Sequence, residues 1–286
     1  MQQSIAALQR NALASGSDLY VFSDAARDEH SKDAVQEVRD CIKRISGFKS
    51  LNIIERTHNL GLAKSIIDGV TLLCNRFGRV VVLEDDIVTS EYFLTYMNDA
   101  LERYASDDRV ISIHGYVYPI RQSLPEAFFL LGADCWGWAT WDRGWQLFNP
   151  SGQLQLDELR RRGLINEFDF NGSYPYSKMM EAQIRGDNDS WAIRWYASAF
   201  LAGKLTLYPG RSLVRNIGND RSGTHCCDSE TYDVGLSAKP IDLRDVPVVP
   251  SFAGRTAFEA FFRGSQGRKG SKILRHLKQL VRSIKV

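Results

Sequence analysis

The sequence predicts an α/β protein with a mostly parallel central sheet flanked by helices. Over the first two-thirds of the 286 residues, short apolar segments alternate with segments in which apolar residues recur at helical spacing. Residues 79–83 give the clearest strand, because a nearly continuous β-branched run is typical of a strand buried on both faces. Strand–helix–strand alternation at this spacing predicts right-handed crossovers between parallel strands.

The expected elements follow one another from the first residues to residue 113. Residues 2–14 carry apolar side chains on one side of a helix, and 18–22 are a short apolar strand that closes on Ser23 and Asp24. Ser90 is expected to cap the last helix of this region. The expected strands are 18–22, 51–54, 79–83 and 110–113, and the expected helices are 2–14, 33–46, 62–76 and 90–105.

Beyond about residue 115 the chain becomes rich in aromatic residues, and four of its six tryptophans fall between positions 136 and 145. Residues 235–255 contain three of the eight prolines and are expected to be extended. A hinge is expected at 264–270. Residues 271–285 have apolar side chains on one face and basic residues elsewhere, which predicts an amphipathic helix.

Charge and cysteine usage exclude several classes of protein. The net charge is +2, but eight Lys and Arg residues follow Glu259 with no acidic residue among them. The rest of the chain therefore has 28 basic against 34 acidic residues, about −6, which argues against a general nucleic-acid binder. Five scattered cysteines predict a reducing compartment, and we expect no secretory signal and no membrane-spanning helix.

Polar residues follow three of the predicted strands. Ser23 and Asp24 end the first, Arg56 and Asn59 follow the second, and the triplet 84–86 (Glu-Asp-Asp) ends the third. In open α/β sheets, ligands bind beyond the carboxyl ends of the strands. Since parallel strands place these ends along one edge, the sequence predicts a ligand site there.

The acidic triplet is the strongest candidate for a metal site. Three adjacent carboxylates repel one another unless a cation gathers them. A hard divalent ion, Mg²⁺ or Mn²⁺, with few protein carboxylates and substrate phosphates completing its shell, suits this setting. The alternative is an acidic turn that leads into the next helix. The position after a buried strand favours the metal.

The other strand ends have both ligand-binding and structural interpretations. Asp24 can accept a hydrogen bond from a nucleobase imide or a ribose hydroxyl, or it can form an Asx turn. Arg56 and Asn59 can hold a nucleotide, and Gly61 permits close backbone approach. Alternatively, Asn59 only caps the next helix.

The aromatic half contains a candidate general base. Asp189 lies just before a helix that begins near Trp191, and it either caps that helix or removes a proton from an attacking hydroxyl. Sugar faces stack on indole rings, so Trp191 favours the second interpretation. Trp136 and Trp138 flank Gly137, which suggests a backbone that approaches a ligand. Trp141 and Trp145 are expected in the core, four residues apart on a helix.

His225 follows a polar, glycine-containing loop and is a candidate metal ligand as a neutral imidazole. A lone histidine in a loop is usually solvated, which is the alternative. The adjacent Cys226 and Cys227 do not indicate a soft-metal site, because the chain has no second cysteine pair to close it.

Taken together, four segments resemble nucleotide-sugar glycosyltransferases of the GT-A fold, over roughly residues 18–230. These are the strand followed by Ser23-Asp24, Arg-x-x-Asn-x-Gly at 56–61, Val-Val-Val-Leu-Glu-Asp-Asp at 80–86, and Asp-Cys-Trp-Gly-Trp-Ala-Thr-Trp at 134–141. The chain is most similar to bacterial family-2-type transferases of cell-surface polysaccharide. It is more distantly similar to the N-acetylglucosaminyltransferase I group, whose metal motif is also Glu-Asp-Asp.

The resemblance implies a role for each matching position. Asp86 would bind Mn²⁺ or Mg²⁺ bridging the donor diphosphate, His225 would complete the metal shell, and Asp189 would be the base of an inverting transferase, although Ser190 stands where the animal group has a second Asp. The donor is expected to be a UDP-sugar and the acceptor a glycan or lipid-linked hydroxyl. The implied donor-binding residues are Ser23, Asp24, Arg56, Asn59, Gly61, Glu84 and Asp85, and the implied sugar-contacting residues are Trp136, Gly137, Trp138 and Trp191.

The same resemblance implies a GT-A, Rossmann-like organisation. Residues 1–115 would be the nucleotide-sugar-binding half, 116–235 the acceptor and catalytic half of the same domain, and 236–286 an extended wrap with a basic tail. Family chains open with a strand that forms the first wall of the nucleotide pocket, whereas this sequence starts in the helix that would follow it. The first strand of the sheet is therefore expected to be missing, which would expose two strand edges.

The basic segment 271–286 is expected to attach the protein to the inner face of an anionic membrane, within an otherwise cytoplasmic location. The alternative is a helix that docks on the acidic body. Two rivals to a transferase remain open: a truncated, non-catalytic nucleotide-sugar-binding subunit, and a nucleotidyltransferase. The lack of a glycine- and lysine-rich loop after a first strand counts against the nucleotidyltransferase.

Overall fold

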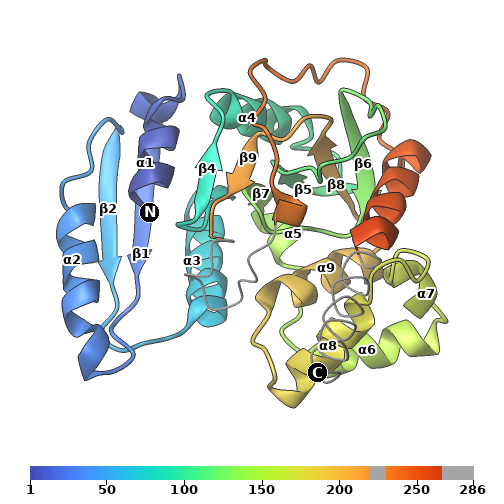
Figure 1. The fold of residues 1–286 in the computed structure, drawn as a ribbon, viewed down its shortest axis with the longest axis horizontal. Helices are drawn as coiled ribbons and strands as arrows, with labels where there is room; N and C mark the ends of the chain where they lie inside the picture. Colours follow the sequence, from blue (N-terminus) through green and yellow to red (C-terminus); the bar gives the residue numbers. More distant parts are fainter. Residues whose placement is uncertain (219–229, 266–286) are drawn as a thin grey trace, which may run out of the picture.

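The computed structural model describes residues 1–218 and 230–265, and over these residues the strands form three sheets (Figure 1). The first sheet contains only β1 (Asp18–Ser23) and β2 (Ser50–Glu55), which are parallel with Asp18 opposite Ser50 and Ser23 opposite Glu55. Helix α2 (Lys32–Ile42) makes the crossover between them. This part of the fold matches the predicted strand–helix–strand unit.

The second sheet has five strands in the order β3-β7-β5-β8-β6, and it corrects the prediction of a mostly parallel sheet. Only the β5–β8 pair is parallel, whereas β3–β7, β5–β7 and β6–β8 are antiparallel. A strand buried on both faces has the same apolar pattern in either direction, so the sequence did not reveal the reversal. The strands are β3 (Arg79–Val82), β5 (Val110–His114), β6 (Ala127–Leu131), β7 (Trp138–Trp141) and β8 (Leu205–Pro209).

The third sheet pairs β4 (Ile87–Thr89) with β9 (Val214–Asn216) in antiparallel fashion. Helix α1 (Gln2–Gln9) packs against β4 and is followed by the 3-10 turn η1 (Ala14–Gly16). The predicted helix over 2–14 therefore ends earlier than expected. Ser90 is not the cap of the next helix, because that helix begins later, at Phe93, with Tyr92 as its N-cap residue. The Ser90 hydroxyl donates to the carbonyl of Ser237 at 2.7 Å and accepts from the Tyr92 amide at 3.3 Å.

The remaining helices cover the five-stranded sheet. Figure 1 shows α6 to α9 gathered at one end of the molecule and a further helix, over 252–265, beside β6. This helix was not predicted, and it falls partly in the segment expected to be extended and in the expected hinge at 264–270. The helices and turns are η2 (Glu29–Ser31), α3 (Leu62–Phe77), α4 (Phe93–Arg103), α5 (Asp142–Trp145), α6 (Gly152–Arg161), α7 (Ile165–Phe168), α8 (Tyr176–Arg185), α9 (Trp191–Leu201) and η3 (Glu230–Tyr232).

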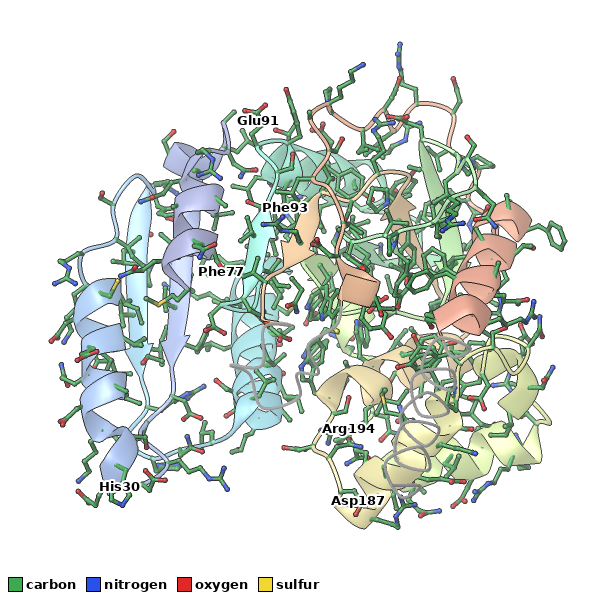
Figure 2. All side chains as sticks on the ribbon, in the orientation of Figure 1. His30, Phe77, Glu91, Phe93, Asp187 and Arg194 are labelled. Atoms are coloured by element: carbon green, nitrogen blue, oxygen red, sulfur yellow. The ribbon has the colours of Figure 1, made fainter. Side chains whose placement is uncertain are left out.

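Helix α3 joins the first two sheets through side-chain contacts. The ring centroids of Tyr20 in β1 and Phe77 in α3 lie 5.7 Å apart, and Figure 2 shows Phe77 in the space between the sheets. A Cβ atom at Gly69 would lie 3.2 Å from the Phe22 ring, so β1 approaches the helix closely there. In the described part of the chain β1 pairs only with β2 and β3 only with β7. The sheet is therefore split between β1 and β3.

The strands differ in burial on the two sides of this split. Every residue of β5, β7 and β8 is buried, whereas the apolar residues of β1, β2 and β3 are only half-buried. None of the helices in the described ranges is long and apolar enough to cross a membrane. The predicted basic helix 271–285 and the candidate ligand His225 lie outside those ranges.

Candidate functional site

The acidic triplet forms the turn between β3 and β4. The amide of Ile87 donates to the carbonyl of Glu84 at 3.1 Å, and the hydroxyl of Ser4 in α1 donates to the carbonyl of Asp85 at 2.6 Å. Burial, together with the charges of Asp86 and Asp85, raises the pKa of Glu84 to about 7. The turn thus holds carboxylates whose negative charge is poorly accommodated by the protein alone.

Asp86 is the member of the triplet with an unsatisfied oxygen. Its Oδ1 atom is buried and has no hydrogen-bond partner, and burial followed by the charge of Asp85 raises its pKa. The segment after β9 passes directly over it, since Ile217 donates to the carbonyl of Asp86 at 2.9 Å and a Cβ atom at Gly218 would collide with the Asp86 carboxylate. A buried carboxylate oxygen without a donor is unfavourable unless another group binds it.

These carboxylates fit a hard divalent cation. The described residues contain no group of three side chains arranged to hold a metal by themselves. Mg²⁺ and Mn²⁺ commonly bind through one or two carboxylates and take their other ligands from water and substrate phosphates. Glu84 and Asp86 are the residues that would bind such an ion.

Asp24 has a structural role in this structure. Its carboxylate accepts the backbone N–H groups of Ala25, Leu60 and Gly61, each at 2.9 Å, and so ties the end of β1 to the start of α3. Asn59 donates from its side chain to the carbonyl of Ala25 at 2.8 Å. These contacts agree with the alternative in which both residues organise the loop. Contact with a nucleobase stays a prediction.

Gly61 and Arg56 lie in the same region. Gly61 is the N-cap of α3 with a φ of 75°, and a Cβ atom there would meet nothing within 4 Å. The Arg56 guanidinium lies over the Phe22 ring, 5.6 Å from its centroid, and Nε is buried without a hydrogen-bond partner. Ser23 is buried and its hydroxyl accepts from Arg39 Nε at 3.3 Å. Of these residues, Arg56 has an unused polar atom.

Most of the tryptophans predicted to contact sugar are core residues. Trp138 is 0% and Trp191 3% exposed, and their rings stack with centroids 5.4 Å apart in a cluster with Trp145 and Trp195. Both rings are therefore occupied by core packing in this structure, and their contact with a sugar stays a prediction. Trp191 instead serves the acidic turn, because a hydrogen bond from its side chain lowers the pKa of Glu84 against the larger effect of burial.

Gly137 also serves packing. Its φ is 62°, and a Cβ atom would lie 2.7 Å from Cγ1 of Val214 in β9. The small residue therefore allows β7 and β9 to approach, and the predicted approach of its backbone to a ligand stays a prediction. Trp136 is only half-buried and packs edge-to-face on Tyr116, with ring centroids 4.7 Å apart. Contact of this ring with a sugar stays a prediction.

Asp189 lies at the exposed start of α9. Its side chain is 71% exposed, and Oδ1 lies 3.2 Å from Nη2 of Arg194, one turn into the helix. Ser190 is the N-cap, because its hydroxyl accepts the Ile193 amide at 3.3 Å. Figure 2 shows Asp187 of the same loop pointing away from the sheets. Asp189 does not itself cap the helix, and its role as a general base stays a prediction.

Sequence reasoning missed two residues beside this site. His114 ends β5 and is fully buried, and Asp134 lies in the loop before β7, with Oδ2 3.7 Å from His114 Nε2. The signal that could have found His114 is the one used for Asp24, a polar residue at the end of an apolar strand. Asp134 begins the Asp-Cys-Trp-Gly-Trp segment, in which only the tryptophans and the glycine were predicted to contact a ligand.

A hollow at the start of β5, the end of that strand opposite His114, is a weaker candidate. It is lined by the loop between α4 and β5 and by Val246 and Val248. Its carboxylate Asp107 is already paired, since Arg109 lies at 2.7 Å and lowers the pKa of Asp107 through a side-chain hydrogen bond. No polar side-chain atom of its lining except the Tyr104 hydroxyl is buried without a partner. The chemistry is therefore concentrated at the acidic turn.

Comparison with protein-family models finds no match for this chain, and no curated protein is significantly similar to it. The candidate site therefore depends on the chain's own geometry.

Proposed function

We propose that this protein is a metal-dependent glycosyltransferase. It moves a sugar from a nucleotide-diphosphate sugar, expected to be a UDP-sugar, to a hydroxyl of a glycan or lipid-linked acceptor, with inversion at the anomeric carbon. One observation carries the proposal: Asp86 keeps a buried oxygen without a hydrogen-bond donor beside Glu84, whose pKa is raised to about 7. This is the electrostatic setting in which a divalent cation binds.

Separate residues of the chain would bind the metal, orient its ligands and accept the proton of the acceptor hydroxyl. Glu84 and Asp86 would hold Mn²⁺ or Mg²⁺, which supplies neutralisation of the charge that develops on the leaving diphosphate. Trp191 orients Glu84 through its side-chain hydrogen bond. Asp189, which is exposed, receives the proton of the acceptor hydroxyl, since a carboxylate must be accessible to act as general base. Arg194 keeps that carboxylate in place.

Isothermal titration calorimetry with UDP, GDP, dTDP and their sugar conjugates, with and without Mn²⁺, tests the proposal. We expect one nucleotide to bind only with metal. Asp86→Asn should abolish this dependence without lowering the melting temperature, because the substitution removes a charge that the protein does not pair. Asp33→Asn, on the exposed face of α2, is the matched control. Equal binding by wild type and Asp86→Asn would overturn the metal site.

The split sheet favours one alternative, a nucleotide-sugar-binding subunit without catalytic activity. Among the described residues no β-ladder joins β1 to β3, so no backbone hydrogen bonds of a sheet hold the proposed base-binding and metal-binding halves of the site together. Incubation of the nucleotide sugar that binds, with release of free nucleotide as the readout, separates the two. Binding with turnover supports the transferase, and binding with no release over hours supports the subunit.

The predicted membrane attachment through 271–286 stays a proposal with its own test. Flotation with vesicles containing anionic lipid should carry the full chain upward, and deletion of 264–286 should abolish this. Attachment that survives the deletion would contradict the proposal.

A further inference from the structure

The imidazole of His114 is an unpartnered polar group in the interior. The side chain is 0% exposed, and neither Nδ1 nor Nε2 has a hydrogen-bond partner. Aromatic rings surround it, with Tyr208 5.1 Å and Tyr116 6.3 Å away between centroids. Burial lowers the pKa of His114, and the charge of Asp134 opposes this effect. The imidazole is therefore held neutral, with one N–H to donate.

Asp134 is the group toward which this histidine is aimed. Its Oδ2 atom lies 3.7 Å from His114 Nε2, just beyond hydrogen-bond length, while Oδ1 accepts the Cys135 amide at 2.8 Å. The Asp134 side chain remains 26% exposed. The Asp134 carboxylate is thus partly open to solvent, and the buried N–H donor of His114 lies behind it.

The surroundings of Asp134 connect it to the acidic turn and to an aromatic wall. Burial raises the pKa of the Cys135 thiol, and the negative charges of Asp134, Glu84 and Asp86 raise it further. The thiol therefore lies within electrostatic range of all three carboxylates. Two residues further on, half-buried Trp136 packs edge-to-face against Tyr116. A carboxylate two residues from a half-buried indole is a combination suited to a pyranose ring, because sugar hydroxyls donate to the carboxylate and the C–H face packs on the part of the ring that stays accessible.

We propose that Asp134 binds a hydroxyl group of the transferred sugar, next to the diphosphate at Asp86, and that His114 is the positioning residue that holds the Asp134 carboxylate in place. The inference rests on the proposed function, because it assigns the sugar subsite of the same donor. Sugar binding draws Oδ2 into a hydrogen bond from His114 Nε2. Asp134 is then a residue that sets the choice of donor sugar.

The test compares a nucleoside diphosphate with its sugar conjugates. With Mn²⁺ present, calorimetry gives the dissociation constants of UDP, UDP-glucose, UDP-galactose and UDP-N-acetylglucosamine, or of the GDP or dTDP series if wild type prefers it. Asp134→Asn should weaken the preferred conjugate about tenfold, since one charge-assisted hydrogen bond is lost, while the affinity for the diphosphate alone changes less than about twofold. Asp33→Asn should change neither.

Two variants isolate the role of His114. His114→Phe keeps the buried ring but removes the N–H, and it should reproduce the selective loss seen in Asp134→Asn. His114→Gln keeps an N–H donor and should retain most of the affinity for the sugar conjugate. Melting temperatures of all variants identify any that fail to fold, in which case Asp134→Asn alone decides.

The outcomes separate the two proposals. If wild type binds none of the nucleotides, the proposed function fails and takes this inference with it. If wild type binds both diphosphate and conjugate, and Asp134→Asn weakens both equally or neither, only this inference is overturned. If His114→Phe binds the conjugate as tightly as wild type, His114 does not position the carboxylate.

Discussion

The carboxylate of Asp24 accepts the backbone N–H of Gly61 at 2.9 Å, and this bond joins the end of β1 to the N-cap of α3. The same carboxylate accepts from Leu60 and Ala25. A negative charge at this position also complements the partial positive charge at the helix N-terminus. The first sheet is thus anchored to the helix that bridges the two sheets.

Removing this anchor should destabilise the protein. We expect Asp24→Ala to lower the free energy of unfolding by about 1–2 kcal/mol, as for the loss of a helix cap. Asp24→Asn should lose less, because its carbonyl oxygen still accepts. Urea unfolding followed by circular dichroism measures both. Indistinguishable midpoints for Asp24→Ala and wild type would show that the bonds contribute nothing.

Gly137 tests close packing between β7 and β9. Gly137→Ala places a methyl group 2.7 Å from Val214 at a φ of 62°, so overpacking adds to backbone strain, for a total of about 2–4 kcal/mol. Gly163→Ala has a similar φ of 67° and no atom within 4 Å, so it isolates the strain at about 1 kcal/mol.

The double variant Gly137→Ala/Val214→Ala completes this comparison. The smaller residue at 214 relieves the overlap but leaves its own cavity, so the two changes should be less destabilising together than their sum. Thermal unfolding gives the four values. Strict additivity would contradict steric contact between the two positions.

Glu84 predicts a pH dependence of stability in the metal-free protein. Its pKa is about 7 in the folded chain against the ordinary value of 4.5, so the folded state holds a proton that the unfolded state releases across that interval. The free energy of unfolding therefore falls as pH rises through this window. Glu84→Gln removes the effect.

Urea unfolding with a chelator at about pH 5 and about pH 8 measures this dependence. The advantage of Glu84→Gln over wild type should be larger at the higher pH. Adding Mn²⁺ should stabilise wild type more than Glu84→Gln under the alkaline condition. An advantage that does not change with pH would mean that the carboxylate has its ordinary pKa.

Glu259 anchors the helix over 252–265. It is 8% exposed and accepts from Arg255 at 2.9 Å, Arg263 at 3.2 Å and the Asn171 side chain at 2.7 Å. Glu259→Ala should lower the free energy of unfolding by about 2–4 kcal/mol, because it leaves partly buried donors unpaired. Glu158→Ala, which breaks an exposed pair with Arg161, should change it by less than about 1 kcal/mol. Equal effects would contradict the role of burial.

The sequence predicted the local elements well and their assembly less well. The segments at 18–22, 51–54 and 79–83 became β1, β2 and β3 because short apolar runs specify strands locally. The direction of pairing in the five-stranded sheet depends on β7, which enters antiparallel between β3 and β5. Its Trp138 was interpreted as a sugar-contacting residue, although a buried strand has the same composition.

The candidate site shows the same division. The acidic turn follows from residues adjacent in sequence, so it was predictable. The hydrogen bonds of Asp24 to Leu60 and Gly61 span 36 and 37 residues, and only the fold shows that they occupy the carboxylate. The burial of Trp138 and Trp191 likewise depends on contact between β7 and α9. Long-range contacts decide which polar and aromatic residues remain available to a ligand.

The interruption between β1 and β3 has a consequence for the dynamics of the molecule. No ladder of backbone hydrogen bonds crosses it in the described part of the chain, so β1, α2 and β2 are held to the rest by side chains such as Phe22 against Gly69. Such a segment opens as a separate cooperative unit. We expect its amide protons to exchange with solvent faster than those of β5 and β8, because this end of the protein unfolds locally while the five-stranded sheet stays folded.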